Sequence, residues 1–123
     1  MQKQPDNAAI LNNLALVYQQ LKDTRALGTA ERAYKLKPDN GAIADTLGWL
    51  LVEQGNIALG IELLQKAAAA APDAPEIRYH LAQGWLKAGD KLKARNELER
   101  LVSANAKFPQ HAEALATLKQ LGN

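Results

Sequence analysis

A pattern of small and apolar residues recurs at intervals of about 34 residues, and this recurrence constrains the fold more than any other feature of the sequence. The central copy holds Leu47, Gly48, Leu51, Gly55, Gly60 and Leu64, and one repeat later stand Leu81, Ala82, Trp85, Gly89, Ala94 and Leu98. A repeat of this length forms one supersecondary unit, which buries its apolar face only against neighbouring units. The sequence therefore predicts a stack of similar units.

A third copy precedes the central one. Its second half lies a full repeat earlier and holds Ala26, Ala30 and Ala33. Its first half lies one position closer to the central copy than a full repeat and holds Leu14, Ala15 and Tyr18. The difference falls in the turn over residues 21–24, which lacks the glycine that the later copies have at Gly55 and Gly89.

Each copy divides at its turn into two halves with helical periodicity. The chain is also rich in alanine, leucine, lysine, glutamate and glutamine, which are strong helix formers. We therefore expect an all-α protein with seven helices, over residues of about 6–21, 24–37, 40–54, 56–71, 75–88, 91–102 and 109–121.

Local signals mark the expected helix ends. The side chains expected to cap helix N-termini are Asp6 or Asn7, Asp39 or Asn40, Asn56 and Asp90. Pro75, together with Glu76 three residues after Asp73, predicts the start of the fifth helix, because this spacing matches a capping box. Gly55 and Gly89 are expected to end the helices before them in a left-handed conformation.

The repeat resembles the tetratricopeptide family. The residues that carry this resemblance in the central copy are Ala44, Leu47, Gly48, Leu51, Gly60, Leu64 and Pro72. The resemblance implies a right-handed superhelix forming a single domain over residues 1–123. It places repeats at about 5–37, 38–71 and 72–106 and a capping helix at about 109–121, within a longer array.

Three apolar rows recur on the first helix of each pair and are expected to be buried: Ile10, Ile43 and Ile77; Leu14, Leu47 and Leu81; Tyr18, Leu51 and Trp85. If the chain is a fragment of a longer array, the first helix lacks a preceding repeat, so part of Ile10, Leu14, Val17 and their neighbours is left uncovered. We then expect a weak homodimer through this helix face.

Positions turned away from these rows are predicted to line a partner-binding groove: Asn12, Leu16 and Gln20; Asp45, Trp49 and Glu53; Glu76, Tyr79, Gln83 and Lys87. Trp49 is the expected central anchor, with Tyr79 across from it. The alternative is that Trp49 packs sideways on the neighbouring first helix. Asp45, Glu53 and Glu76 make the predicted lining acidic.

Catalysis is not expected. The chain has no cysteine and one serine, and its histidines, His80 and His111, belong to no recognisable catalytic motif. His80 is expected to be a packed or half-exposed side chain. We therefore predict no catalytic, cofactor-binding or metal site. The net charge of +2 and the mixed signs over residues 91–100 argue against nucleic-acid binding, and no segment has the apolar length needed to insert into a membrane.

Two narrower comparisons bear on the partner. Some tetratricopeptide proteins grip a chaperone's terminal carboxylate with basic residues, but the matching positions here are Asn12, Leu16, Thr46, Glu76 and His80, so such a clamp is not expected. Residues 45–55, 71–82 and Phe108–Pro109 resemble the C-terminal end of tetratricopeptide lipoproteins that accompany PEP-CTERM/exosortase systems. This second resemblance implies a bacterial cell-envelope location and a role beside exopolysaccharide export or protein sorting.

The family resemblance implies an interaction scaffold that binds a peptide or protein segment in its groove. The alternative is a structural spacer or self-association module within a longer repeat array. Both remain open from the sequence.

Overall fold

The computed structural model describes residues 7–103 and 110–121, which form seven helices and no strand. The helices are α1 (Ala8–Gln20), α2 (Arg25–Leu36), α3 (Gly41–Glu53), α4 (Ile57–Ala70), α5 (Pro75–Lys87), α6 (Lys91–Ser103) and α7 (His111–Leu121). The all-α prediction is confirmed. The predicted start of the first repeat at residue 5, the cap at Asp6 and the Phe108–Pro109 pair lie outside the described residues.

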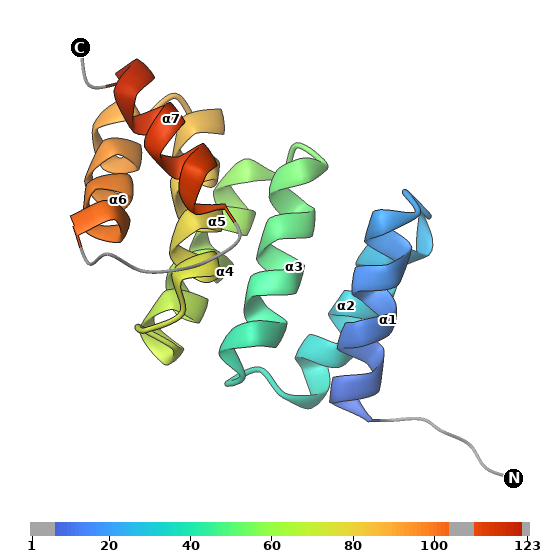
Figure 1. Cartoon of the computed structure of the whole chain (residues 1–123). Coiled ribbons are helices and arrows are strands. Elements are labelled where there is room, and N and C mark those ends of the chain that lie inside the picture. Colours follow the sequence, from blue (N-terminus) through green and yellow to red (C-terminus); the bar gives the residue numbers. More distant parts are fainter. Residues whose placement is uncertain (1–6, 104–109, 122–123) are drawn as a thin grey trace, which may run out of the picture.

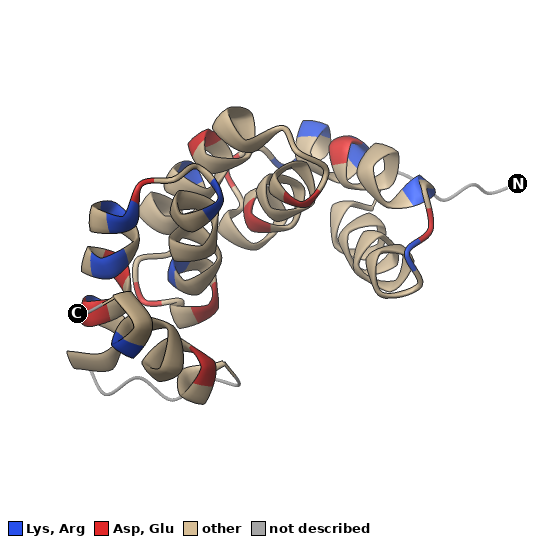
Figure 2. Cartoon of the chain, turned by 90° about the horizontal axis from the view of Figure 1, so that it is seen from above, with Lys and Arg blue, Asp and Glu red and all other residues tan. Residues whose placement is uncertain are grey.

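Consecutive helices form antiparallel pairs, α1 with α2, α3 with α4 and α5 with α6, and the pairs stack side by side (Figure 1). The first helices, α1, α3 and α5, contact one another in sequence. Seen from above, the stack bends into an arc that has these three helices on its inner side and α2, α4 and α6 on its outer side (Figure 2). The inner side is called the concave face below.

Side-chain caps form at most of the predicted starts. The carboxamide oxygens of Asn7 and Asn40 accept hydrogen bonds from the backbone N–H groups of Ile10 and Ile43, at 3.1 and 3.0 Å. Asp90 accepts one from the N–H of Lys93 at 3.1 Å. Asn56 precedes α4 but makes no side-chain cap.

The capping box predicted for α5 is wrong. The N-cap residue is Ala74, whose methyl group makes no such bond, and Pro75 occupies the first turn. Proline fixes the backbone angle that a first helical residue needs and has no N–H to satisfy, so this helix starts without a side-chain cap.

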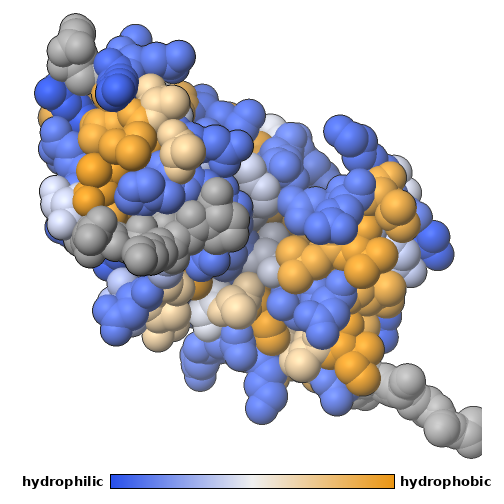
Figure 3. Space-filling model, in the orientation of Figure 1, coloured by the Kyte–Doolittle hydropathy of each residue, from blue (hydrophilic) through white to orange (hydrophobic). Residues whose placement is uncertain are grey.

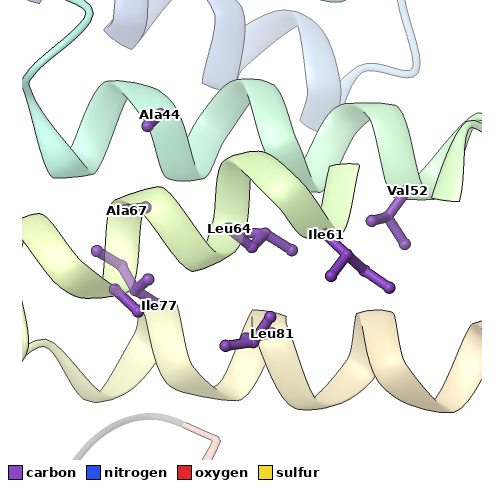
Figure 4. Close-up of a cluster of buried hydrophobic side chains, with 8 residues drawn as sticks. Ala44, Val52, Ile61, Leu64, Ala67, Ile77 and Leu81 are labelled. Atoms are coloured by element: carbon purple, nitrogen blue, oxygen red, sulfur yellow. The ribbon is translucent and has the colours of Figure 1, made fainter. Parts of the chain in front are cut away.

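The core lies between successive pairs, where α4 fits between α3 and α5 (Figure 4). Leu64, Leu98 and Val52 are its largest fully buried side chains. The predicted apolar rows are buried in the second and third pairs, apart from Trp85, which is half-buried. In the first pair the prediction fails, because Ile10 is 60% and Leu14 37% exposed. Both side chains are among those expected to lie uncovered when no other repeat packs against the first helix.

Arg78 stands where the first two repeats have Leu11 and Ala44, and a long charged side chain ordinarily keeps its guanidinium in water. Instead it is mostly buried and lies 3.3 Å from Glu97 of α6, while its Nε donates to the carbonyl of Pro72 at 3.3 Å. The ion pair therefore links α5 to α6. None of the seven described helices combines the length and hydropathy needed to span a bilayer.

Candidate functional site on the concave face

The predicted groove residues divide by exposure. Asn12, Asp45, Trp49, Tyr79 and Gln83 are half-buried, whereas Leu16, Gln20, Glu53, Glu76 and Lys87 are partly to fully exposed. Asp45, Trp49 and Tyr79 are held by contacts between helices. These contacts define the surface that a partner would meet.

Trp49 of α3 stacks on the ring of His80 of α5, with centroids 4.7 Å apart and planes 18° from parallel. His80 Nδ1 lies 2.8 Å from the carboxylate oxygen of Asp45, one turn before Trp49 on α3. Trp49 also packs against the central core cluster. It therefore contacts the neighbouring first helix, as the alternative interpretation held, without being fully buried.

A second polar link joins α1 to α3 on the same side. The amide nitrogen of Gln19 donates to a carboxylate oxygen of Glu53 at 2.8 Å. Glu53 remains exposed beyond this bond. The three first helices are thus tied together by side chains, Gln19 to Glu53 and Asp45 to His80, in addition to their apolar contacts.

Tyr79 was expected to face Trp49 across the groove, but the ring stacked on Trp49 is that of His80. Tyr79 packs against the cluster of Ala82, Leu98, Leu101 and Ala114, and Leu118 and Leu121 of α7 pack against the same cluster. Burial raises the pKa of its phenol, with a further contribution from the charge of Glu113. A hydrogen bond with Gln83 acts on the pKa in the opposite direction. Tyr79 is therefore half-buried against a cluster that the last helix also covers.

A hollow of about 510 Å³ lies between the N-terminal halves of α1 and α3. Its lining is rich in amide side chains and small residues: Asn7, Ala8, Ala9, Asn12, Asn13, Lys37, Asn40, Ala42 and Ile43. The side-chain oxygen of Asn12 is buried and has no hydrogen-bond partner among the described residues. A buried acceptor without a donor costs free energy.

The chemistry of this face favours binding. It offers a half-exposed indole, amides and carboxylates, which are groups able to stack and to form hydrogen bonds. His80 is paired with Asp45, as a packed histidine should be, and the described residues contain no cluster of three or more potential metal ligands.

Sequence reasoning missed His80 and Gln19 as parts of this face. The signal that could have identified them is the sequence distance between complementary side chains. Gln19 and Glu53 are 34 residues apart and Asp45 and His80 are 35 apart, close to one repeat. Complementary side chains separated by one repeat lie on adjacent first helices and can therefore pair.

Antiparallel helix pairs stacked into an arc, with their first helices lining the inner side, define a helical-repeat protein of the solenoid class. Residues 51–118, more than half of the chain, match the sequence model of the tetratricopeptide repeat. The chain belongs to the tetratricopeptide repeat family, whose members generally serve as protein–protein interaction scaffolds.

Individual relatives agree with this family. The chain is similar to TPR repeat-containing protein PA4667 of Pseudomonas aeruginosa, with 38% identity over 85 residues, or 66% of this chain and 14% of that protein. Two solved structures share the fold. YrrB has a TM-score of 0.80 and 19% identity, over 94% of this chain and 58% of YrrB. The first TPR domain of human RPAP3 has a TM-score of 0.83 and 14% identity, over 97% of this chain and 92% of that domain.

Proposed function

We propose that the concave face binds a peptide or protein segment that crosses α1, α3 and α5. The observation that carries this proposal is the hollow between α1 and α3, which combines space for a chain segment with the unpartnered oxygen of Asn12. A backbone N–H of a bound segment supplies the missing donor. Ala9 and Ala42 on the lining leave room for close approach.

The remaining groove residues indicate the chemistry of the segment. Trp49 presents a half-exposed aromatic surface, suited to an apolar side chain. Asp45, Glu53 and Glu76 favour lysine or arginine nearby, so affinity should fall as salt screens these charges. YrrB, which shares the fold, is described as a TPR protein with an unusual peptide-binding site, and this supports a groove-bound peptide here.

Trp49→Ala tests the proposal. The chain and its variants serve as bait against the envelope fraction of the native organism, and the affinity of a captured partner is then measured by calorimetry. We expect Trp49→Ala to weaken binding by about 2–4 kcal/mol, as for a central anchor. The matched control is Trp85→Ala, because Trp85 is also half-buried but has Lys93 of α6 over its ring at 4.6 Å, outside the predicted groove.

Circular dichroism of both variants establishes that the helices are retained. Equal losses of binding in the two tryptophan variants, or no loss in either, would contradict the groove as the binding site. The tryptophan fluorescence of the Trp85→Ala variant, which then reports Trp49 alone, should change when the partner is added.

A second candidate function is favoured by the uncovered face of α1. In this alternative the chain is a structural spacer or self-association module of a longer array, and its surfaces mainly support other repeats. A spacer would bind no partner through Trp49. The same affinity measurements therefore distinguish the two functions.

The resemblance to tetratricopeptide lipoproteins of PEP-CTERM/exosortase systems supports a further proposal about context. We propose that the protein acts in the bacterial cell envelope, beside exopolysaccharide export or protein sorting. Fractionation of the native organism with an antibody against this chain tests the location. Recovery only in the cytoplasmic fraction would contradict it.

A further inference from the structure

The face of α1 turned away from the rest of the stack carries an unbroken apolar stripe. Ile10, Leu14 and Val17, followed by Leu21 at the C-cap, are 60%, 37%, 50% and 69% exposed. Their spacings of four, three and four residues place them in one line along the helix. Figure 3 shows apolar surface over this end of the molecule. These four residues are called the α1 stripe below.

The same stripe is covered in the other pairs. Its equivalents on α3, Ile43, Leu47 and Leu50, are only 4%, 5% and 3% exposed, because α2 packs against them. On α5, Ile77 and Leu81 are 5% and 4% exposed beneath α4. On α7, Ala114, Leu118 and Leu121 pack against α6. Among the described helices, α1 alone presents this surface bare.

Among the residues that the structure describes, a second copy of the chain offers only one surface to match it. In the described part of the chain nine large apolar residues are exposed. Five of them belong to α1 and its C-cap, and the other four, Leu36, Leu59, Leu92 and Leu115, lie on four different helices. The second helices α2 and α4 are already placed between first helices, and α6 lies between α5 and α7. The apolar partner available on another copy is therefore the α1 stripe itself.

The charge of α1 permits such a contact. The sequence of α1 contains no acidic or basic side chain, so two copies of this helix meet without like-charge repulsion. An antiparallel approach also sets the N-terminus of each helix beside the C-terminus of the other, where their dipoles attract. A two-fold axis relates two α1 helices that meet in this antiparallel way, because the same residues of the two copies then face each other.

We propose that the α1 stripe binds the α1 stripe of a second copy, forming a two-fold symmetric dimer with the two helices antiparallel. This inference develops the self-association named above and does not depend on the concave groove. A face of one 13-residue helix is about 20 Å long and about 10 Å wide, well below the roughly 800 Å² per partner of a standard interface. The dimer should therefore be weak, with a Kd of about 0.1–1 mM.

Dimerisation has a functional consequence. Each copy carries one concave groove, so the dimer presents two. A partner with two binding segments is then held more tightly than either groove holds one segment, without any new contact.

Sedimentation equilibrium over a concentration series, up to about 1 mM, tests the proposal with Val17→Glu. Two copies of this variant bring carboxylates together inside the contact, so we expect the Kd to rise at least about tenfold. Leu59→Glu is the matched control, because Leu59 is 43% exposed on α4, and its Kd should not change. An equimolar mixture of Val17→Glu and Val17→Lys should restore dimer formation through opposite charges.

A pure monomer at about 1 mM would overturn the dimer and leave a preceding repeat as the cover of the stripe. A dimer that Val17→Glu does not weaken would also overturn it, because another surface would then be responsible. Trp49→Ala should leave the Kd of the dimer unchanged. Failure of the dimer and failure of the groove are thus distinguishable.

Discussion

Two glycines set the distance between α3 and α4. A Cβ atom added at Gly60 would lie 2.5 Å from a methyl of Val52 and 2.7 Å from the carbonyl oxygen of Gly48. One added at Gly48 would lie 2.9 Å from the carbonyl of Gly60. Because these neighbours include backbone atoms, side-chain rotation cannot relieve the contact. The small residue predicted at this repeat position is required by the close crossing of the two helices.

Gly60→Ala should therefore destabilise the protein. We expect the free energy of unfolding to fall by about 1–3 kcal/mol, the usual range for an overpacked core. Gly28→Ala is the matched control, since Gly28 lies within α2 and an added Cβ there meets nothing within 4 Å. That change should raise stability by up to about 1 kcal/mol through helix propensity. Urea unfolding followed by circular dichroism measures both, and equal effects would refute the steric argument.

Lys22 is strained for a different reason. It occupies the turn between α1 and α2 with φ of +58°, whereas the corresponding turns use Gly55 and Gly89 at +94° and +86°. The following residue, Asp23, accepts bonds from the backbone and side chain of Arg25. These bonds lower the pKa of Asp23 to about 2 and hold the turn in place. The missing glycine noted in the sequence thus forces lysine into a left-handed conformation.

Lys22→Gly should remove this strain. Left-handed backbone costs a non-glycine residue about 1 kcal/mol, partly offset by the extra freedom of glycine in the unfolded chain. The net gain should be small and measurable as a higher melting temperature. At Lys37, where φ is −139°, the same substitution relieves nothing and should lower it. A gain at Lys37 but none at Lys22 would refute the explanation.

Among the elements, α7 covers the third pair. Its Ala114, Leu118 and Leu121 pack with Leu98 and Leu101 of α6 and with Tyr79 of α5. The last helix thus occupies, against α6, the place that α3 occupies against α2. Open arrays require a terminal element of this kind, with one apolar side for the stack and a polar side for water.

Deleting residues 110–123 should lower the melting temperature or cause aggregation, because the apolar surface of α6 becomes exposed. Tyr79 gives an independent readout. The pKa of Tyr79 is raised in the folded protein. Neutral Tyr79 therefore contributes stability at pH values below its ordinary pKa of about 10, and this contribution is lost as the pH rises through the folded pKa. Removing α7 should shift the titration of this phenol to lower pH, observed by ultraviolet absorbance with Tyr79→Phe as reference. An unchanged melting curve for a soluble truncation would contradict the capping role.

The helices could be predicted from the sequence because their signals are local. Asn40 lies three residues before Ile43, and Asp90 lies three residues before Lys93. This spacing is enough to predict where α3 and α6 start. The start of α5 was harder, since Asp73 and Glu76 imitate a capping box that does not form. A local pattern permits a cap, but the path of the preceding turn decides whether the side chain reaches the amide.

At the scale of the whole molecule, prediction was limited by contacts between units. The spacing of Trp49 shows that it turns away from the core, but the rotation between neighbouring helices decides that His80 is the ring it meets. The connection before α7 is longer than the earlier ones, so the repeat spacing no longer indicates which residues this helix covers. The packing of Tyr79 against the cluster that α7 also covers was unpredictable for that reason.

The two described ends of the array differ, so an engineered helix pair would pack differently at each end. A helix pair can be fused before residue 7. If its second helix is similar to α2, that helix can pack against the exposed side chains of Ile10, Leu14 and Val17. A pair fused after residue 121 meets the water-facing side of α7, where Lys119 and Gln120 are exposed. Of the two described ends, the face of α1 should therefore accept an added repeat more readily than the face of α7.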